Sequence, residues 1–160
     1  MNITANNSFL ELIGSKPRHI SINVIQKELS KLPQYTPKTE HFFHGGMYCR
    51  KVYRDADVLI IGAVHKKEHF YVVASGTVAV TDGASKAVEI TGPAVILSKP
   101  GTKRAVLSIT EAVCMTFHKT DAATVEEAEA ELVEEDPGSM FLPGNIPKQY
   151  FIAPEGMEEK

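Results

Sequence analysis

The sequence predicts an all-β fold, either a closed barrel or a jelly roll, with a helical arm before it and an acidic helix and an extended tail after it. About eight short segments between His41 and Lys119, rich in β-branched and aromatic residues, follow one another at spacings of about 10 residues. Turn-forming clusters such as Arg54-Asp-Ala-Asp57 separate these segments. The chain has 160 residues, 43% of them hydrophobic, which is enough for one domain around one core.

Residues 1–40 are expected to form an arm outside the barrel. Val24, Ile25, Leu29 and Leu32 have the spacing of a short helix, and Pro33 ends it. The segment after this helix is expected to be extended because of its prolines. The sequence leaves two arrangements open, in which the arm packs either on its own barrel or on a neighbouring subunit.

The barrel itself is expected to occupy residues 41–119. Ser75-Gly76 is predicted to be a tight turn that joins two strands into a hairpin. The predicted strands are Met47–Tyr53, Val58–His65, His69–Ala74, Thr77–Thr81, Ala87–Ile90, Ala94–Ser98, Arg104–Ile109 and Ala112–His118.

An acidic helix is predicted for residues 120–136, and an extended tail for residues 137–160. Thr124 and Glu127 have the spacing of a capping box, while Ala128 and Leu132 belong to an apolar stripe. Residues 121–136 contain acidic residues and no basic ones. A solvated helix face explains such a charge run without any binding role.

The composition excludes several classes of protein. A net charge of −3 and a pI near 6.1 give no reason to expect nucleic-acid binding. Cys49 and Cys114 lie in apolar, strand-like surroundings, which favours buried, reduced thiols. The first residues lack the pattern of a signal peptide, and no apolar run reaches about 18 residues. We therefore expect a cytoplasmic protein that binds neither nucleic acid nor a membrane.

Two polar segments of the barrel resemble the two motifs of the cupin family. The first cupin motif has two histidines one residue apart, then a glutamate and a glycine. In this chain Gly76 matches the closing glycine, His65 the second histidine and His69 the glutamate position, whereas Ala63 replaces the first histidine. The resemblance implies a cupin barrel, a double-stranded β-helix of the jelly-roll type, with only part of the usual metal-binding set.

The second cupin motif, a proline-glycine turn with a histidine three positions later, is matched by Pro100-Gly101. Arg104 stands where that histidine would be. Residues 40–135 also resemble small cupin-like proteins encoded by tailed phages. The resemblance lies in the amino-acid sequences around His65–His69 and Ser98–Arg104. This second resemblance implies a phage accessory protein without a settled activity.

Alternation along the strands is expected to bring His65, His69, Tyr71 and Arg104 to the inside of the barrel, with Leu59 and Ile61 on the same face. The planar guanidinium of Arg104 suits a carboxylate or a phosphate, and the histidines can donate hydrogen bonds. Lys99 and Lys103 could add charge at the rim. The favoured hypothesis is a binding protein, not an enzyme, that captures a small anionic molecule such as a nucleotide or a nucleotide-derived signal.

A metal-dependent cupin enzyme, either an oxygenase, an isomerase or a lyase, is the first alternative. His65 and His69 would be the ligands, with nickel, zinc or iron(II) as the metal. Two histidines are too few for such a site unless His44, His118 or Cys114 joins them, and the positive charge of Arg104 opposes a cation. No cofactor is therefore favoured from the sequence.

A structural or interaction protein of a phage particle is the second alternative, with the barrel as a scaffold and the arm and tail as binding elements. His65 and Arg104 would then be a buried polar bridge that closes the barrel. Under all three hypotheses a homo-oligomer is expected, because barrels with open sheet edges often pair.

Overall fold

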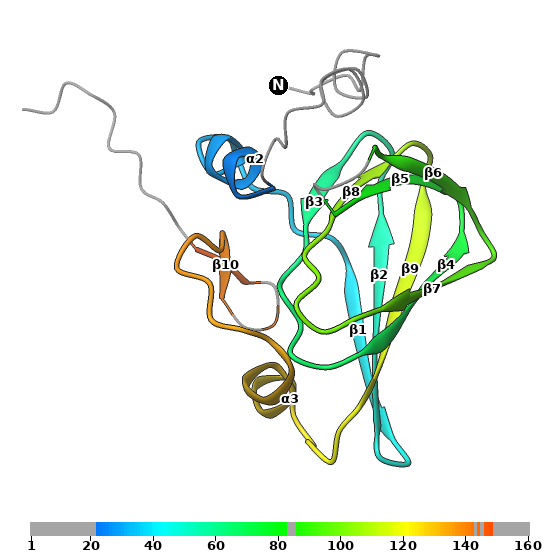
Figure 1. The fold of residues 1–160 in the computed structure, drawn as a ribbon, viewed down its shortest axis with the longest axis vertical. Helices are drawn as coiled ribbons and strands as arrows, with labels where there is room; N and C mark the ends of the chain where they lie inside the picture. Colours follow the sequence, from blue (N-terminus) through cyan, green and yellow to red (C-terminus); the bar gives the residue numbers. More distant parts are fainter. Residues whose placement is uncertain (1–21, 83–85, 143, 145, 149–160) are drawn as a thin grey trace, which may run out of the picture.

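The computed structural model describes residues 22–82, 86–142, 144 and 146–148. Within these ranges two antiparallel sheets face each other across a core (Figure 1). One sheet has the strand order β1-β2-β9-β4-β7 and the other the order β3-β8-β5-β6. Their strands are β1 (Thr39–His44), β2 (Met47–Arg54), β3 (Leu59–Ile61), β4 (His69–Ser75), β5 (Thr77–Thr81), β6 (Val88–Thr91), β7 (Ala94–Ser98), β8 (Ala105–Ser108) and β9 (Ala112–Lys119).

The chain passes back and forth between the two sheets. Strands β2, β4, β7 and β9 lie in the larger sheet, while β3, β5, β6 and β8 lie in the smaller one. This order is that of a jelly roll, which confirms the predicted all-β fold. The hairpin predicted at Ser75-Gly76 is wrong, because β4 pairs with β7 and β9 whereas β5 pairs with β6 and β8. The turn at Gly76 carries the chain from one sheet to the other.

Gly76 fits this crossover because it has no side chain. Its φ angle is +81°, and a Cβ there would lie 2.1 Å from the carbonyl oxygen of Glu111. We expect Gly76→Ala to lower the free energy of unfolding by about 3 kcal/mol, since the left-handed conformation alone costs about 1–2 kcal/mol and the backbone clash adds to it.

Gly101→Ala is the matched control for this prediction. Gly101 has a φ of +80°, but a Cβ added there would meet no heavy atom within 4 Å beyond its own chain neighbours. Only the conformational cost of about 1–2 kcal/mol should therefore remain. Equal losses for the two variants in chemical denaturation would contradict the steric argument at Gly76.

The predicted strand Val58–His65 is cut short. Only Leu59–Ile61 pairs with β8, whereas the prediction extended it to His65. Beyond it, residues 64–66 pair with residues 132–134 instead, through Glu134 N–H to the Val64 carbonyl and Lys66 N–H to the Leu132 carbonyl. The register also corrects the expected inner face. Ile60 pairs with Val106, which lies in the core, so Leu59 and Ile61 share the opposite face.

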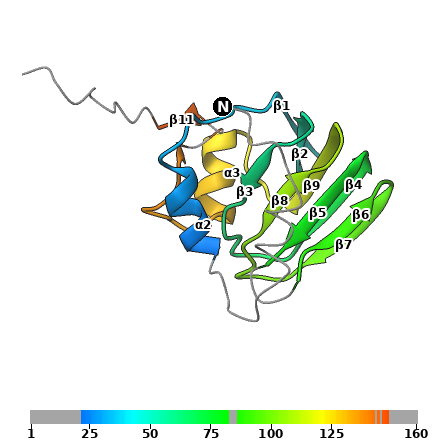
Figure 2. The ribbon, with the colours of Figure 1, turned by 90° about the horizontal axis from the view of Figure 1, so that it is seen from above.

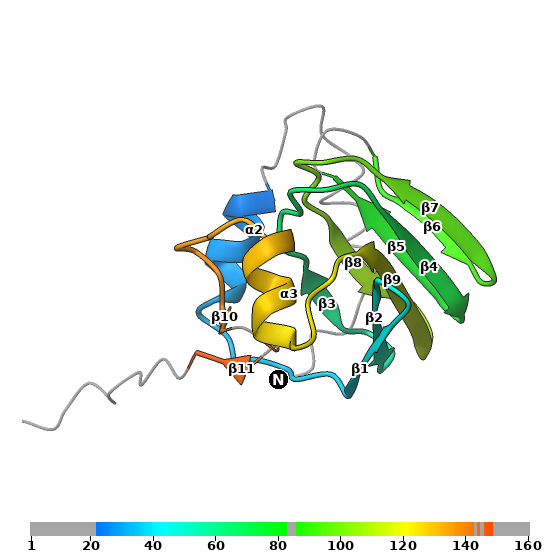
Figure 3. The same ribbon diagram turned by 90° about the horizontal axis from the view of Figure 1, so that it is seen from below.

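One side of the barrel is covered by the remaining elements. Figures 2 and 3 show helices α2 (Ile22–Leu29) and α3 (Val125–Leu132) and the strand pair β10 (Phe141–Leu142) and β11 (Ile146–Pro147) beside β1 and β3, away from β6 and β7. Helix α2 therefore packs within its own chain, while residues 1–21 of the arm lie outside the described residues. No helix in the described ranges is long and apolar enough to cross a membrane.

Helix α3 is shorter than the predicted range of 120–136. It begins after Thr124, whose hydroxyl accepts a hydrogen bond from the Glu127 amide, as the capping-box spacing predicted. It ends at Leu132 because Val133 adopts an extended conformation and forms a β-bridge with His65. Ala128 and Leu132 are buried as expected. The end of α3 thus fixes the backbone of His65.

Candidate functional site

A cavity of about 1640 Å³ extends from the barrel interior into the space beneath α2, α3 and residues 134–142. The strands contribute a polar wall to it and an apolar floor. The floor belongs to a core cluster that includes Val73, Val78, Val106 and Cys114, of which Val106 and Cys114 line the cavity. Such a combination of apolar walls with a few convergent polar groups is usual for a small-molecule site.

The strand register sorts the inner residues of the larger sheet into three rows, because paired residues of antiparallel strands share a face. The innermost row is apolar: Val52, Cys114, Val73 and Ala94. The middle row is Arg50, Thr116, Tyr71 and Ile96. The outer row is Tyr48, His118, His69 and Ser98, with His118 placed beside His69 by extending the same register one step. Polarity therefore increases from the floor toward the end nearest α3.

Arg50, Arg54 and Arg104, here called the arginine set, all line the cavity. No ion pair in the described part of the chain includes any of them. The Nε atoms of Arg50 and Arg54 are buried without a hydrogen-bond partner. Arg54 is 7% exposed, and its Nη1 lies 3.5 Å from the Val106 carbonyl oxygen, while Arg104 donates a 2.6 Å hydrogen bond to the Ser98 hydroxyl.

Acidic residues outside the strands partly oppose the charge of the arginine set: Glu129 of α3 acts on Arg50, and Asp82 acts on Arg104. The strands that line the cavity contribute no carboxylate. Burial lowers the pKa of Arg50, and Glu129 of α3 partly offsets this effect. The pKa of Glu129 is itself raised by burial, and its carboxylate already accepts hydrogen bonds of 3.1 and 3.0 Å from the Gly144 amide. The barrel wall therefore carries positive charge that the protein leaves largely unpaired.

Tyr71 lies within this cationic environment. Its side chain is 9% exposed, and its hydroxyl makes no hydrogen bond to an oxygen or nitrogen of the described residues. Burial raises the pKa of Tyr71 to about 12, against the opposite effects of Arg54 and Arg104. The hydroxyl is therefore protonated near neutral pH and available as a hydrogen-bond donor.

His65, His69 and His118, here called the three-histidine cluster, meet at the same end of the barrel. Their ring centroids are 4.3 Å apart for His65 and His69, 4.9 Å for His65 and His118, and 4.5 Å for His69 and His118. One nitrogen of each ring lies within 4.8 Å of the others. Three imidazole nitrogens so close together could hold a transition-metal ion.

The protonation of the cluster suits metal binding. Burial lowers the pKa of His65 and of His118 to about 3, helped by neighbouring histidines and by Arg50. Burial likewise lowers the pKa of His69. His69 donates from Nδ1 to the Lys67 carbonyl at 3.3 Å, which leaves the lone pair on Nε2. The Nδ1 atom of His118 is buried without a partner. All three rings are therefore neutral at pH 7.

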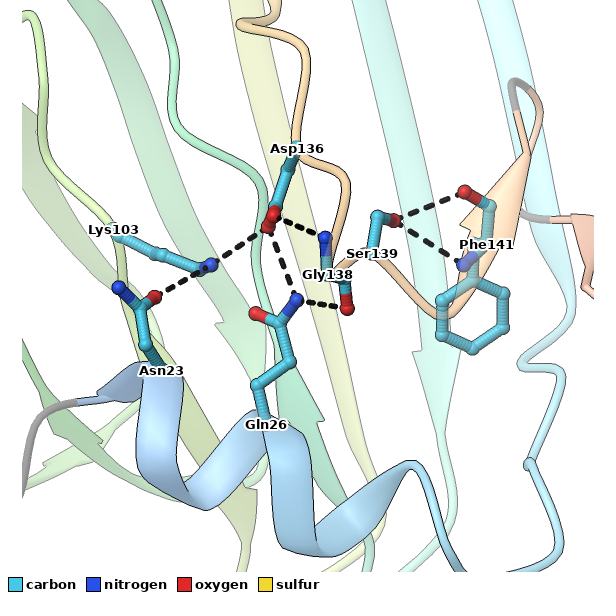
Figure 4. Close-up of polar contacts among 7 residues, drawn as sticks. All are labelled: Asn23, Gln26, Lys103, Asp136, Gly138, Ser139 and Phe141. Atoms are coloured by element: carbon cyan, nitrogen blue, oxygen red, sulfur yellow. Dashed lines mark hydrogen bonds and ion pairs between the residues drawn. The ribbon is translucent and has the colours of Figure 1, made fainter.

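Of the residues predicted from the sequence, His65, His69, Tyr71 and Arg104 line the cavity. Lys99 is exposed and does not line it. Lys103 points elsewhere: its Nζ lies 2.8 Å from Asp136 and 3.1 Å from the Asn23 side chain (Figure 4). Gln26 of α2 also donates to Asp136, at 3.1 Å. Lys103 thus ties α2 to the segment that follows α3.

The sequence hypothesis missed Arg50 and Arg54 and left His118 out of the favoured site. The available signal was period-two alternation, because Arg50 and Arg54 share a face with Val52, which the structure shows to be buried; the prediction had ended that strand at Tyr53. His118 was weighed only as an alternative ligand. It alternates with Cys114 and Thr116 on β9 and therefore shares their inner face.

Comparison with known proteins supplies fold neighbours only. No protein-family model and no curated protein matches the chain. Similar solved structures include a cupin-2 domain protein from Shewanella frigidimarina, at 10% identity over 59% of this chain and 91% of that one, with a TM-score of 0.43. A cupin superfamily protein from Desulfitobacterium hafniense has 7% identity over 58% and 88%, with a TM-score of 0.43. KdgF from Halomonas sp. has 8% identity over 52% and 80%, with a TM-score of 0.46.

The strand order itself carries the assignment of the fold. It defines a two-sheet jelly-roll barrel, which is the fold that the resemblance of the two polar motifs to cupins implied. The interior sets this chain apart from the usual cupin pattern, because it combines the arginine set with histidines at altered positions.

Proposed function

We propose that this chain is a binding protein that captures a small carboxylate or phosphate compound in the barrel. The observation that carries the proposal is Arg50, whose charge faces the cavity without an ion-pair partner among the described residues. A buried cation lowers the stability of a protein unless something neutralises it. An anionic ligand would supply that neutralisation.

The chemistry of the wall fits such a ligand. Guanidinium groups present planar donor pairs that match carboxylate and phosphate oxygens. The Tyr71 hydroxyl and the Thr116 hydroxyl, both without hydrogen-bond partners in the described ranges, add neutral donors in the same row as Arg50. The apolar floor would accommodate the uncharged part of the molecule. Arg104 is the member of the set nearest the outer row, since it bonds Ser98 there.

A panel of paired compounds tests the proposal. Sugar phosphates, nucleotides and small carboxylates should raise the melting temperature or give binding heats, whereas their uncharged alcohol or amide analogues should not. Arg104→Ala should weaken the best binder by about 10-fold or more, because a hydrogen bond to a charged group contributes about 1.5–3 kcal/mol. Equal responses to charged and neutral partners would count against an anion site.

A metal-dependent enzyme is the second candidate, and the three-histidine cluster favours it. The third histidine removes the shortage of ligands that weakened this hypothesis at the level of sequence. His65, His69 and His118 would hold a divalent transition metal such as zinc, nickel or iron(II), which acts as a Lewis acid when bound. The neighbouring arginines would then bind and orient an anionic substrate.

The setting suggested by the sequence resemblance is that of an accessory protein of a tailed phage, acting in the host cytoplasm. A nucleotide or a nucleotide-derived signal is the ligand that this setting would favour. Both statements remain predictions, as does the alternative of a structural protein in a phage particle. The paired-compound panel includes nucleotides for this reason.

A further inference from the structure

The outer face of the larger sheet carries an uninterrupted apolar row. Paired residues share a face, so the register places one residue from each of its five strands in line across the sheet. None of the five is charged. From one edge to the other the row is Phe42, Cys49, Phe117, Phe70 and Leu97.

A second row extends this surface. Met115, Val72 and Val95 lie side by side on β9, β4 and β7, while Glu40 and Lys51 complete the row on β1 and β2. Glu40 and Lys51 form an ion pair of 3.6 Å at that corner. We call the eight apolar residues of the two rows the outer apolar patch: Phe42, Cys49, Phe117, Phe70, Leu97, Met115, Val72 and Val95.

The patch faces solvent in the single chain. Leu97 is 72% exposed, Val95 is 62% exposed, and Phe42 and Phe70 are each 50% exposed. Strands about 4.8 Å apart and rows about 7 Å apart give the patch an area of roughly 300 Å². Stable interfaces bury about 800 Å² per partner, with an apolar centre and a polar rim. The patch therefore has the size of an interface centre, and Glu40 and Lys51 lie at its rim.

We propose that the outer apolar patch is the interface of a homodimer in which the larger sheets of two copies pack face to face. The patch is a pleated sheet face and not a groove, and two sheets with the same twist pack well against each other. β9 is the central strand of the five. A twofold axis along β9 would set Phe70 of each copy over Cys49 of the other, and Leu97 over Phe42. The bulky Phe70 would thus meet the small Cys49, while Phe117 of the two copies would meet at the axis.

The dimer is independent of the proposed ligand site. The patch lies on the outer face of the sheet, whereas the arginine set and the three-histidine cluster lie within it. The cavity would remain open in both copies. The proposed interface is a sheet face, whereas the sequence led us to expect pairing through open sheet edges.

The mass of the full-length chain in solution tests the proposal. Light scattering from low micromolar to the highest soluble concentration should give twice the 17.5 kDa mass of one chain. Phe70→Lys combined with Leu97→Lys should shift the mass to that of one chain. Val88→Lys is the matched control, because Val88 is 58% exposed but lies on β6 of the other sheet. A monomeric wild-type chain, or a dimer that survives the double substitution, would overturn the proposal.

Cross-linking tests the orientation without relying on a disruptive variant. Met115→Cys, in a chain that also carries Cys49→Ser, would place one thiol of each copy beside the twofold axis. A short bis-maleimide should then join two copies efficiently, while Val88→Cys in the same background should give none. Equal cross-linking at the two positions would contradict the face-to-face arrangement.

Discussion

Arg50→Met is expected to abolish most of the anion binding while making the unliganded protein more stable. Arg50 has no ion-pair partner among the described residues and its Nε is buried without a hydrogen bond, so its charge costs folding free energy that methionine would not cost. We expect the free energy of unfolding to rise by about 1 kcal/mol. Affinity for the best anionic compound should fall about 10- to 150-fold, as the loss of a charged hydrogen bond predicts.

Lys51→Met is the matched control, because Lys51 is the next residue on β2 and pairs with Glu40. It removes the same charge from the outer side of the strand and should leave ligand affinity unchanged. Calorimetric titration and chemical denaturation of the three proteins measure both effects. If Arg50→Met destabilises the unliganded protein, Arg50 has a structural partner and the account of the unpaired charge is wrong.

His118→Ala is expected to remove metal uptake almost completely if the three-histidine cluster is a metal site. The buried imidazole of His118 supplies the third nitrogen of the cluster, and two histidines alone bind divalent metals weakly. Affinity for zinc or nickel should fall by at least about 100-fold. Elemental analysis after metal loading and desalting measures this, with about one equivalent expected for the wild-type chain.

His44→Ala serves as the comparison for metal uptake. His44 is exposed on β1 and lies outside the cluster, so its removal should change nothing. Metal retained equally by both variants would place the binding elsewhere on the protein. A wild-type chain that takes up no metal would leave the cluster as a stack of neutral rings that closes one end of the barrel.

The fold could be predicted from the sequence because its signals are local. Strand β7 was predicted with the bounds Ala94–Ser98 that the structure shows, since β-branched residues and flanking turns define it. Strand β1 (Thr39–His44) was not among the predicted strands, and its start falls in the range predicted for the arm. The early end of β3 could not be predicted, because it depends on the bridge between His65 and Val133, residues that are distant in sequence.

Only the part of the candidate site that lies in local sequence motifs could be predicted. His65, His69 and Arg104 fall within recognisable motifs, whereas Arg50 and His118 are brought to them by strand pairing across the larger sheet. Alternation alone shows that Arg50 shares a face with Val52, but not which face is inside. Lys103 is an example of a residue that the sequence wrongly suggested for the site. It belongs to a cationic cluster near a motif, which suggested a role in ligand binding, but its side chain bonds Asp136.

A crystal structure of the chain, purified without chelators and grown with the best compound from the panel, tests the central claim most directly. The account predicts that the anionic group lies within hydrogen-bond distance of Arg50 and Arg104, with the Tyr71 hydroxyl beside it. A compound bound outside the barrel, with water alone between these arginines, would contradict it.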